Sequence, residues 1–276
     1  STPDQPRSGA EGASRGATDP PPERGPGPKL GGIYPSSEQA WPVDQRELTW
    51  QDDVRGRTFR TLAYLPDADI ARVPLVLYSP GMGGTHEGNL FLAEHWAAHG
   101  YAVLMFDHPG SNIEVFEREG VAGLRKALLD RENVVLRTGD VRHVLDELQS
   151  GYASQPFLYG RVDTTRIAMT GHSYGSFTTM ALAGMVFEYR GDPRHSLVDP
   201  RISAAIAMGP QGREDRYFGI DEHAWDDVRI PVMLMTGTED AGSSGQDYTW
   251  RYDPFNFMPP GDKYIVVIEG AGHNSY

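Results

Sequence analysis

The feature of this sequence that most constrains its fold is a series of short, almost continuously apolar runs separated by stretches with helical periodicity. Such runs are typical of strands buried on both faces of a parallel sheet. In chain order they are VPLVLYS, YAVLMFD, RIAMT, ISAAIAMG, IPVMLMTG and KYIVVIEG. Alternation of strands like these with helices predicts a layered α/β fold with a mainly parallel central sheet and helices on both faces.

Two further patterns complete the predicted architecture. RELTWQDD and TFRTLAYLP alternate apolar and polar residues on either side of VRGR, which predicts antiparallel N-terminal strands joined as a hairpin. Helices are expected over residues 89–100, 132–151 and 176–189. Residues 210–228 are polar and irregular with scattered aromatic residues, so this segment is a candidate cover for a pocket.

The first 31 residues differ in composition from the rest of the chain. They contain 7 Pro and 6 Gly, and Leu30 is their only large apolar residue, so we expect residues 1–31 to form a disordered tail and residues 32–276 one catalytic domain. Tails of this composition follow removed export signals, and expression linkers look alike. The expected location is secreted or periplasmic, with the cytoplasm left open.

Charge and composition exclude several classes of function. The net charge of −13, from 25 Lys and Arg against 38 Asp and Glu, leaves no broad cationic surface for nucleic acid or anionic lipid. The absence of cysteine removes disulfides, thiolate metal sites and cysteine nucleophiles. No apolar run approaches the roughly 18 residues that a membrane-spanning helix needs. The sequence indicates nothing about oligomeric state.

A candidate nucleophile lies in the segment GHSYGS, residues 171–176. Here a buried strand runs directly into Gly-His-Ser-Tyr-Gly and then into a helix, which is the strand-turn-helix context of a nucleophile elbow. The flanking glycines allow the close backbone approach that the strained serine turn requires. The sequence therefore predicts that Ser173 is a nucleophile, with a turn serine of no chemical role as the alternative.

A serine nucleophile needs a base and an acid, and in this kind of elbow they follow in the order acid, then histidine. His273 lies in the glycine-rich turn after the last apolar run, and Asp240 lies where the preceding run opens into a loop. We expect His273 to act as general base and then acid, and Asp240 to orient its imidazole. Four other carboxylates are rivals for the acid role: Glu239, Asp247, Asp262 and Glu269.

An oxyanion hole needs two backbone amides. One is expected from Tyr174, the residue after the nucleophile, and the other from the loop SPGMGG after an early strand. Met82 is the expected donor in that loop, with Gly83 and Gly84 as alternatives. Together with Ser173 these residues form the predicted site, for which we expect no cofactor.

Other polar and aromatic residues have less specific patterns. His172 is expected to support the elbow by packing, and the His95, His99 and Glu94 set is better explained by a half-buried helix face than by a metal. The segment DHPGSN, residues 107–112, follows a strand and either faces the site or is a capped loop without a chemical role. A pocket wall or ordinary packing is expected of Tyr217, Phe218, Trp225, Trp250, Tyr252, Phe255 and Phe257.

These residues resemble a known branch of the α/β-hydrolase fold. SPGMGG, LAEHWAAHGYAVLMFDHPGSN, DVRHVLDEL, RIAMTGHSYGS and IPVMLMTGTED are similar to predicted dienelactone hydrolases and platelet-activating-factor acetylhydrolase-like serine esterases, over roughly residues 73–273. In the eukaryotic acetylhydrolases the acid follows the strand after the nucleophile. Here that strand ends in IAMGPQG, which carries no carboxylate, so Asp240 stays the expected acid. True dienelactone hydrolases use a cysteine nucleophile, which this chain lacks.

A more distant resemblance is to polyester hydrolases and cutinase-like enzymes. Those carry an aromatic residue in the oxyanion loop and a methionine after the nucleophile, whereas here Met82 and Tyr174 are exchanged. The tryptophan that they carry after the following strand is also absent. The fold normally ends with a helix packed on the sheet, but this chain stops at Tyr276, so we expect either a fragment or a terminus held by another contact.

The sequence thus predicts a cofactor-independent serine hydrolase that cleaves small neutral carboxylic esters through an acyl-enzyme, with small-molecule or polymeric esters as substrates. Polyester cleavage is expected only as a side activity. Two alternatives stay open at this point. One is an acyltransferase that uses the same residues with an alcohol in place of water, and the other is a non-catalytic binding domain that keeps the fold.

Overall fold

The computed structural model describes residues 41–67, 72–151, 155–213, 218–242 and 244–276. The predicted tail, residues 1–31, lies outside these described residues. Its disorder, its implication for export and the single catalytic domain over residues 32–276 therefore stay predictions.

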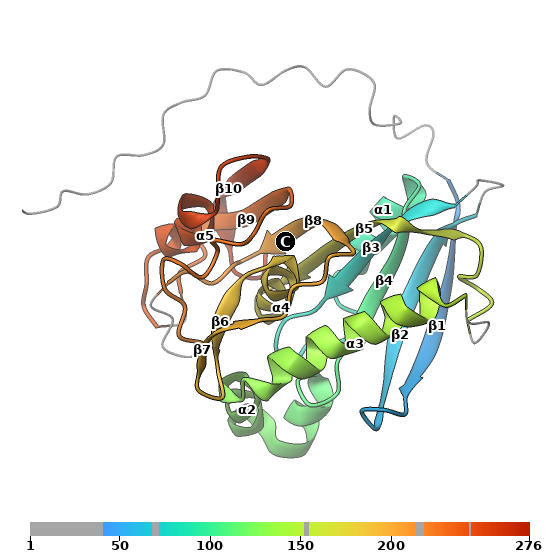
Figure 1. The fold of residues 1–276 in the computed structure, drawn as a ribbon, viewed down its shortest axis with the longest axis horizontal. Coiled ribbons are helices and arrows are strands. Elements are labelled where there is room, and N and C mark those ends of the chain that lie inside the picture. The colour runs from blue at the N-terminus through green and yellow to red at the C-terminus, as the bar shows by residue number, and fades with distance from the viewer. Residues whose placement is uncertain (1–40, 68–71, 152–154, 214–217, 243) are drawn as a thin grey trace, which may run out of the picture. The chain divides into compact units, whose positions relative to one another are not determined.

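A central eight-stranded sheet organises the structure (Figure 1). Its strands lie in the order β1-β2-β4-β3-β5-β8-β9-β10. Their bounds are β1 Val43–Asp52, β2 Arg57–Pro66, β3 Val73–Ser79, β4 Ala102–Asp107, β5 Val162–His172, β8 Ile202–Met208, β9 Val232–Glu239 and β10 Lys263–Gly272. Strand β2 pairs antiparallel with β1 and β4, and all other neighbours are parallel. The predicted hairpin and mainly parallel sheet are confirmed.

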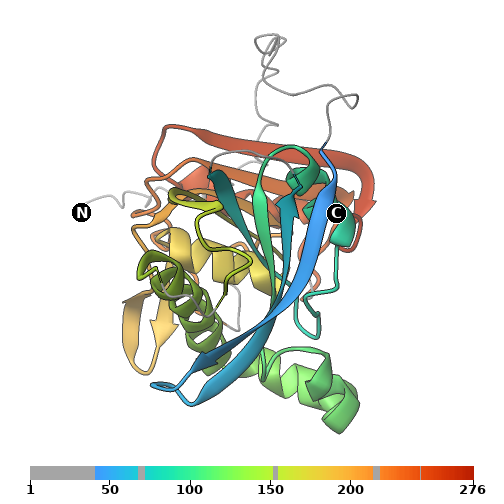
Figure 2. The same cartoon turned by 90° about the vertical axis from the view of Figure 1, so that its right-hand side faces the viewer.

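Helices cover both faces of this sheet (Figure 2). Their bounds are α1 Leu90–Ala98, α2 Ile113–Leu129, α3 Glu132–Gln149, α4 Tyr174–Ala183, α5 Asp253–Phe257 and the 3-10 helix η2 Tyr248–Tyr252. On one face α1 packs Ala93 and Ala97 against strand residues such as Val103. On the other face Val141 and Leu145 of α3 pack in a separate apolar cluster. None of the described helices has the length and apolar character needed to cross a membrane.

One predicted helix is shorter than expected. The helix expected over residues 176–189 ends at Ala183, because the next residue, Gly184, takes a φ of 117°. A Cβ at Gly184 would lie 2.8 Å from the carbonyl oxygen of Asp227, so the backbone there has no room for a side chain. The chain then forms strand β6 (Val186–Tyr189), which pairs with β7 (Asp192–Ser196) in a small second sheet.

Residues 210–228 carry more buried apolar side chains than their polar composition suggests. Among the described residues of this segment, Phe218, Ile220 and Trp225 are buried. They belong to the apolar cluster that also contains Phe177 of α4. This part of the segment is therefore anchored to the core beside the nucleophile helix, and its expected role as a pocket cover stays a prediction.

Candidate active site

Ser173 occupies the sharp turn between strand β5 and helix α4. Its φ of 56° and ψ of −116° lie where non-glycine residues are rarely found, and such backbone strain costs about 1–3 kcal/mol. The turn is held by the surrounding structure, because the Ser173 amide donates to the carbonyl oxygen of Met208 at 2.8 Å. The strained turn places the serine at the carboxyl end of its strand, at the edge where open α/β sheets carry their sites.

Glycine is required on both sides of this serine because the backbone is crowded there. A Cβ at Gly171 would lie 2.3 Å from the carbonyl oxygen of Gly175. A Cβ at Gly175 would lie 1.8 Å from the carbonyl oxygen of Ser79, at the end of the neighbouring strand β3. The glycines of GHSYGS are therefore explained by close packing of helix α4 on the ends of two strands.

The structure brings the three predicted chemical groups together in one hydrogen-bonded row. The Ser173 Oγ lies 2.8 Å from Nε2 of His273, and Nδ1 of His273 lies 2.7 Å from Oδ1 of Asp240. These residues leave the ends of β5, β10 and β9 respectively. An ionised carboxylate accepts only, so Nδ1 carries the proton and Nε2 is left as the acceptor for the serine hydroxyl.

Asp240 is the carboxylate in this row, and it is fully buried. Its Oδ2 accepts hydrogen bonds from the hydroxyls of Thr236, at 3.2 Å, and Tyr276. Burial raises the pKa of Asp240, but hydrogen bonds from His273 and Tyr276 and the charge of Arg251 outweigh it and hold the pKa below its ordinary value. Asp240 is therefore an anion at neutral pH.

Arg251 is a buried cation beside this carboxylate that the sequence patterns did not reveal. Its Nη2 lies 2.7 Å from Oδ1 of Asp240, and its Nε donates to the Asp240 carbonyl oxygen at 2.8 Å. Its Nη1 donates to the carbonyl oxygens of Gly209 and Pro210, both at 2.9 Å. One guanidinium thus joins the loop after β8 to the loop after β9 and fixes the carboxylate between them.

His172 packs beside both Tyr276 and His273. Tyr276 is 7% exposed, and its ring centroid lies 5.8 Å from that of His172, which lies 4.8 Å from that of His273. His172 Nε2 lies 2.6 Å from the His273 carbonyl oxygen. Burial, followed by the nearby His273, lowers the pKa of His172 to about 4, so this imidazole is neutral and donates to that carbonyl.

The loop SPGMGG, the predicted oxyanion loop, lies directly against the serine. A Cβ at Gly81 would approach Cβ of Ser173 at 3.4 Å. The Gly83 amide donates to the Ser111 carbonyl oxygen at 2.8 Å and the Gly84 amide to that of Gly81 at 3.1 Å, so neither is free to face a substrate. The structure thus gives backbone acceptors to the Gly83 and Gly84 amides, and Met82 stays the predicted donor of this loop.

Tyr174 supplies the other expected amide. It is the first residue of helix α4, and amides in the first turn of a helix have no intrahelical acceptor. The dipole of the helix also favours negative charge at this end. The Tyr174 side chain points into the protein, where it is 2% exposed and packs beside Phe218.

The remaining candidates lie elsewhere. Asp247 caps helix η2 by accepting from the Thr249 amide, and the other rival acids, Glu239, Asp262 and Glu269, are exposed. The ring centroids of His95 and His99 lie 4.2 Å apart, with the two rings tilted by 35°. Within the described part of the chain, no group of three or more His, Cys, Asp or Glu side chains is arranged to hold a metal ion. Among the aromatic candidates Phe218 and Trp225 pack in the core, and Tyr217 lies outside the described residues.

The strand order and the serine turn define a protein of the α/β-hydrolase fold, and comparison with known structures agrees. A putative dienelactone hydrolase from Klebsiella pneumoniae subsp. pneumoniae superposes with a TM-score of 0.63 at 17% identity, over 84% of this chain and 88% of that chain. A cold-adapted esterase from an Arctic intertidal metagenomic library gives a TM-score of 0.61 at 18% identity, over 89% and 91% of the two chains.

Within this fold, the sequence is similar to bacterial cutinases. Cutinase est2 of Thermobifida alba is 26% identical over 200 residues, which cover 72% of this chain and 52% of the cutinase. Cutinase 2 of Thermobifida cellulosilytica is 24% identical over 199 residues, covering 72% and 59%. The chain spans about half the length of the curated relatives it matches. No protein-family model matches the chain. The predicted resemblance to dienelactone hydrolase-like and cutinase-like α/β-hydrolases is confirmed.

Proposed function

We propose that this protein is a serine hydrolase that cleaves small neutral carboxylic esters through an acyl-enzyme. The observation that carries the proposal is the hydrogen-bonded row of Ser173, His273 and Asp240, with the serine on a strained turn at the end of a parallel strand. The names of the similar proteins support the same class, since they include cutinases and an esterase.

In the proposed first step, the Ser173 Oγ attacks the ester carbonyl carbon and forms a tetrahedral intermediate. His273 Nε2, at 2.8 Å, accepts the hydroxyl proton as the bond forms. Asp240 keeps the proton on Nδ1 and stabilises the imidazolium. The carbonyl oxygen becomes an oxyanion, which the amides of Met82 and Tyr174 bind. The intermediate collapses when His273 returns the proton to the leaving alcohol.

In the proposed second step, a water molecule gives a proton to His273 and attacks the acyl carbon, and the acid is released as Ser173 recovers its proton. No metal or organic cofactor takes part in either step. Arg251 supports both steps indirectly, because it keeps Asp240 ionised and binds the backbone of the two loops that carry the site.

The proposal is tested with p-nitrophenyl esters from acetate to long acyl chains, assayed on wild type and Ser173→Ala. We expect hydrolysis by wild type, a loss of at least about a thousandfold in the variant, and a chain-length profile that measures the acyl pocket. Equal rates for the two proteins would refute the assignment of Ser173. Transester as the main product in the presence of added alcohol would replace the hydrolase with an acyltransferase.

A further inference from the structure

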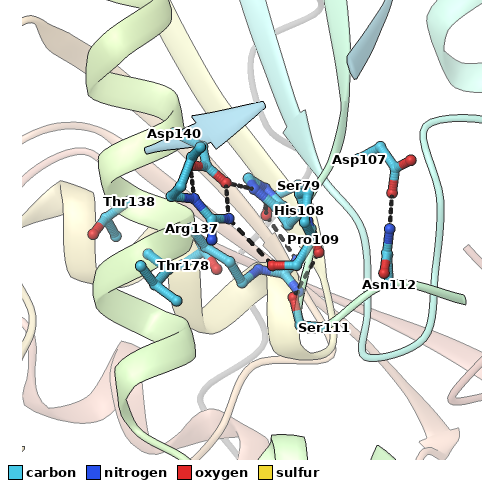
Figure 3. A network of polar contacts seen from close by, with 12 residues as sticks. Ser79, Asp107, His108, Pro109, Ser111, Asn112, Arg137, Thr138, Asp140 and Thr178 are labelled. Atoms are coloured by element: carbon cyan, nitrogen blue, oxygen red, sulfur yellow. Dashed lines mark hydrogen bonds and ion pairs between the residues drawn. The ribbon is translucent and has the colours of Figure 1, made fainter. Parts of the chain in front are cut away.

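A second row of serine, histidine and aspartate lies in the interior of the protein (Figure 3). The Ser79 Oγ lies 3.1 Å from Nε2 of His108, and Nδ1 of His108 lies 3.0 Å from Oδ2 of Asp140. All three side chains are at most 1% exposed. Because no substrate reaches a serine buried to this degree, the row is not a second active site, and its polar groups need another explanation.

The charges on this row are well defined. Burial raises the pKa of Asp140, but the hydrogen bonds from His108 and Arg57 outweigh burial and lower the pKa to about 2. The carboxylate is therefore ionised. Arg57 binds both of its oxygens at 2.8 Å, and Arg55 binds Oδ1 at 3.0 Å. Burial, then the charge of Arg137, lowers the pKa of His108 to about 4, so this imidazole is neutral.

These protonation states give the hydrogen bonds a direction. Asp140 accepts from Nδ1 of His108, so Nε2 of the neutral ring must accept from the Ser79 hydroxyl. The Ser79 oxygen in turn accepts from Nη2 of Arg137 at 2.9 Å. The row therefore ends at Arg137, and Ser79 presents it with a lone pair in a fixed position.

Arg137 is a buried cation that makes its hydrogen bonds to neutral oxygens. It is 1% exposed, and burial lowers its pKa to about 10, which leaves it charged at neutral pH. Besides Ser79, it donates to the Ser111 Oγ at 3.1 Å and to the Pro80 carbonyl oxygen. A buried charge of this kind is costly compared with a well-packed apolar side chain, so stability alone does not account for it well.

Arg137 contacts both halves of the proposed oxyanion hole. Pro80, whose carbonyl it binds, lies two residues before Met82 in the oxyanion loop. The guanidinium carbon also lies 4.9 Å from the ring centroid of Tyr174, which carries the other amide. A third contact, Ser111, binds Arg137 through its hydroxyl and the Gly83 amide through its carbonyl oxygen. A single planar side chain thus connects every segment that places an oxyanion donor.

We propose that Arg137 is a positioning residue that sets the separation of the Met82 and Tyr174 amides, and that the Ser79, His108 and Asp140 row holds Arg137 in place. This inference rests on the proposed function, because it assigns the two amides to an oxyanion. Arg137 does not touch substrate. Its effect on the reaction arises from the loop that it holds, so removal of Arg137 weakens binding of the transition state more than binding of the ester.

The test compares Arg137→Met with Arg142→Met. Arg142 lies on the same helix α3 and binds the carbonyl oxygens of Leu197, at 2.6 Å, and Val198, at 3.1 Å. Its loss therefore reports the general destabilisation that follows when a partly buried contact of this helix is removed. For Arg137→Met we expect kcat per folded molecule to fall about 100-fold while KM changes less than about threefold. The affinity for an alkyl boronic acid, which forms a tetrahedral serine adduct, should fall with kcat. Arg142→Met should change neither kcat nor the boronic acid affinity by more than about threefold.

A second measurement does not depend on activity. Amide hydrogen exchange at residues 81–84 should accelerate at least tenfold in Arg137→Met and stay unchanged in Arg142→Met at matched stability. If Arg137→Met does not fold, both measurements are made on Arg137→Lys, which keeps the charge but lacks the planar guanidinium. We expect kcat and the exchange rate to change in the same direction as in Arg137→Met. Near-normal kcat with unchanged exchange would overturn the positioning role. Ester hydrolysis that persists in Ser173→Ala would instead refute the proposed function. The exchange data would then still show whether Arg137 holds residues 81–84 in place.

Discussion

The hydroxyl of Tyr276 donates to the same buried carboxylate, that of Asp240, whose other oxygen binds His273. The two hydrogen bonds occupy opposite oxygens, so the carboxylate cannot rotate without losing one of them. Tyr276 is therefore a support for the proposed acid.

Tyr276→Phe should lower stability by about 1–2 kcal/mol at neutral pH, since a hydrogen bond to a charged, buried group is lost. That bond helps to lower the pKa of Asp240, so its stabilisation is fully present above the ordinary aspartate pKa and is lost as the pH falls through the lowered value. Urea unfolding of both proteins across pH should show the difference shrink in acid. In the Asp240→Asn background the same substitution should have a much smaller effect.

Asp240→Asn should leave the fold intact and lower kcat by roughly 10³–10⁴-fold, because an amide in this place does not hold the proton on Nδ1 of His273. Circular dichroism checks the fold, and ester hydrolysis checks the rate. Asp247→Asn is the matched control, since that carboxylate caps helix η2, and it should keep near-normal activity. Normal turnover in Asp240→Asn would assign the acid to another carboxylate.

Gly175→Ala should prevent formation of the serine turn and destabilise the protein by about 3 kcal/mol or more, because the new Cβ would lie 1.8 Å from the Ser79 carbonyl oxygen. Gly88→Ala is the control, since a Cβ there meets its nearest atom, the Thr85 carbonyl oxygen, at 3.4 Å. Thermal unfolding should separate the two variants clearly. Equal melting temperatures would contradict the packing described for the elbow.

The pH dependence of stability should reveal the two buried neutral histidines. His108 and His172 have pKa values lowered from 6.5 to about 4, so unfolding takes up protons between these values and stability falls as the pH drops from 6.5 toward 4. Each histidine contributes about 1.4 kcal/mol per pH unit within that window. His172→Gln should reduce the slope between pH 5 and 6 by one such increment. An unchanged slope would mean that His172 is not buried in its neutral form.

Much of the site could be predicted because its signals are local. The serine turn has its glycines within two residues, and the acid and histidine each follow an apolar run, so chain order alone brought Ser173, Asp240 and His273 to one edge of the sheet. In the structure the three side chains meet in one hydrogen-bonded row, and the roles assigned to them stay proposals.

What the sequence did not reveal depends on contacts between residues far apart in the chain. Arg251 and Arg137 are ordinary arginines in their local context, and only packing shows that each is buried and joins separate loops. Local periodicity carries no record of such partners, so sequence reasoning did not find them.

The proposed reaction passes through an ester bond between the acyl group and Ser173. The decisive measurement is mass spectrometry of the protein mixed with p-nitrophenyl acetate and quenched in acid, followed by peptide mapping. We expect an acetyl group on the peptide that contains Ser173, its loss with time in water, and no adduct in Ser173→Ala. Steady hydrolysis with an acetyl group on another residue, or with none at all, would contradict the proposed reaction.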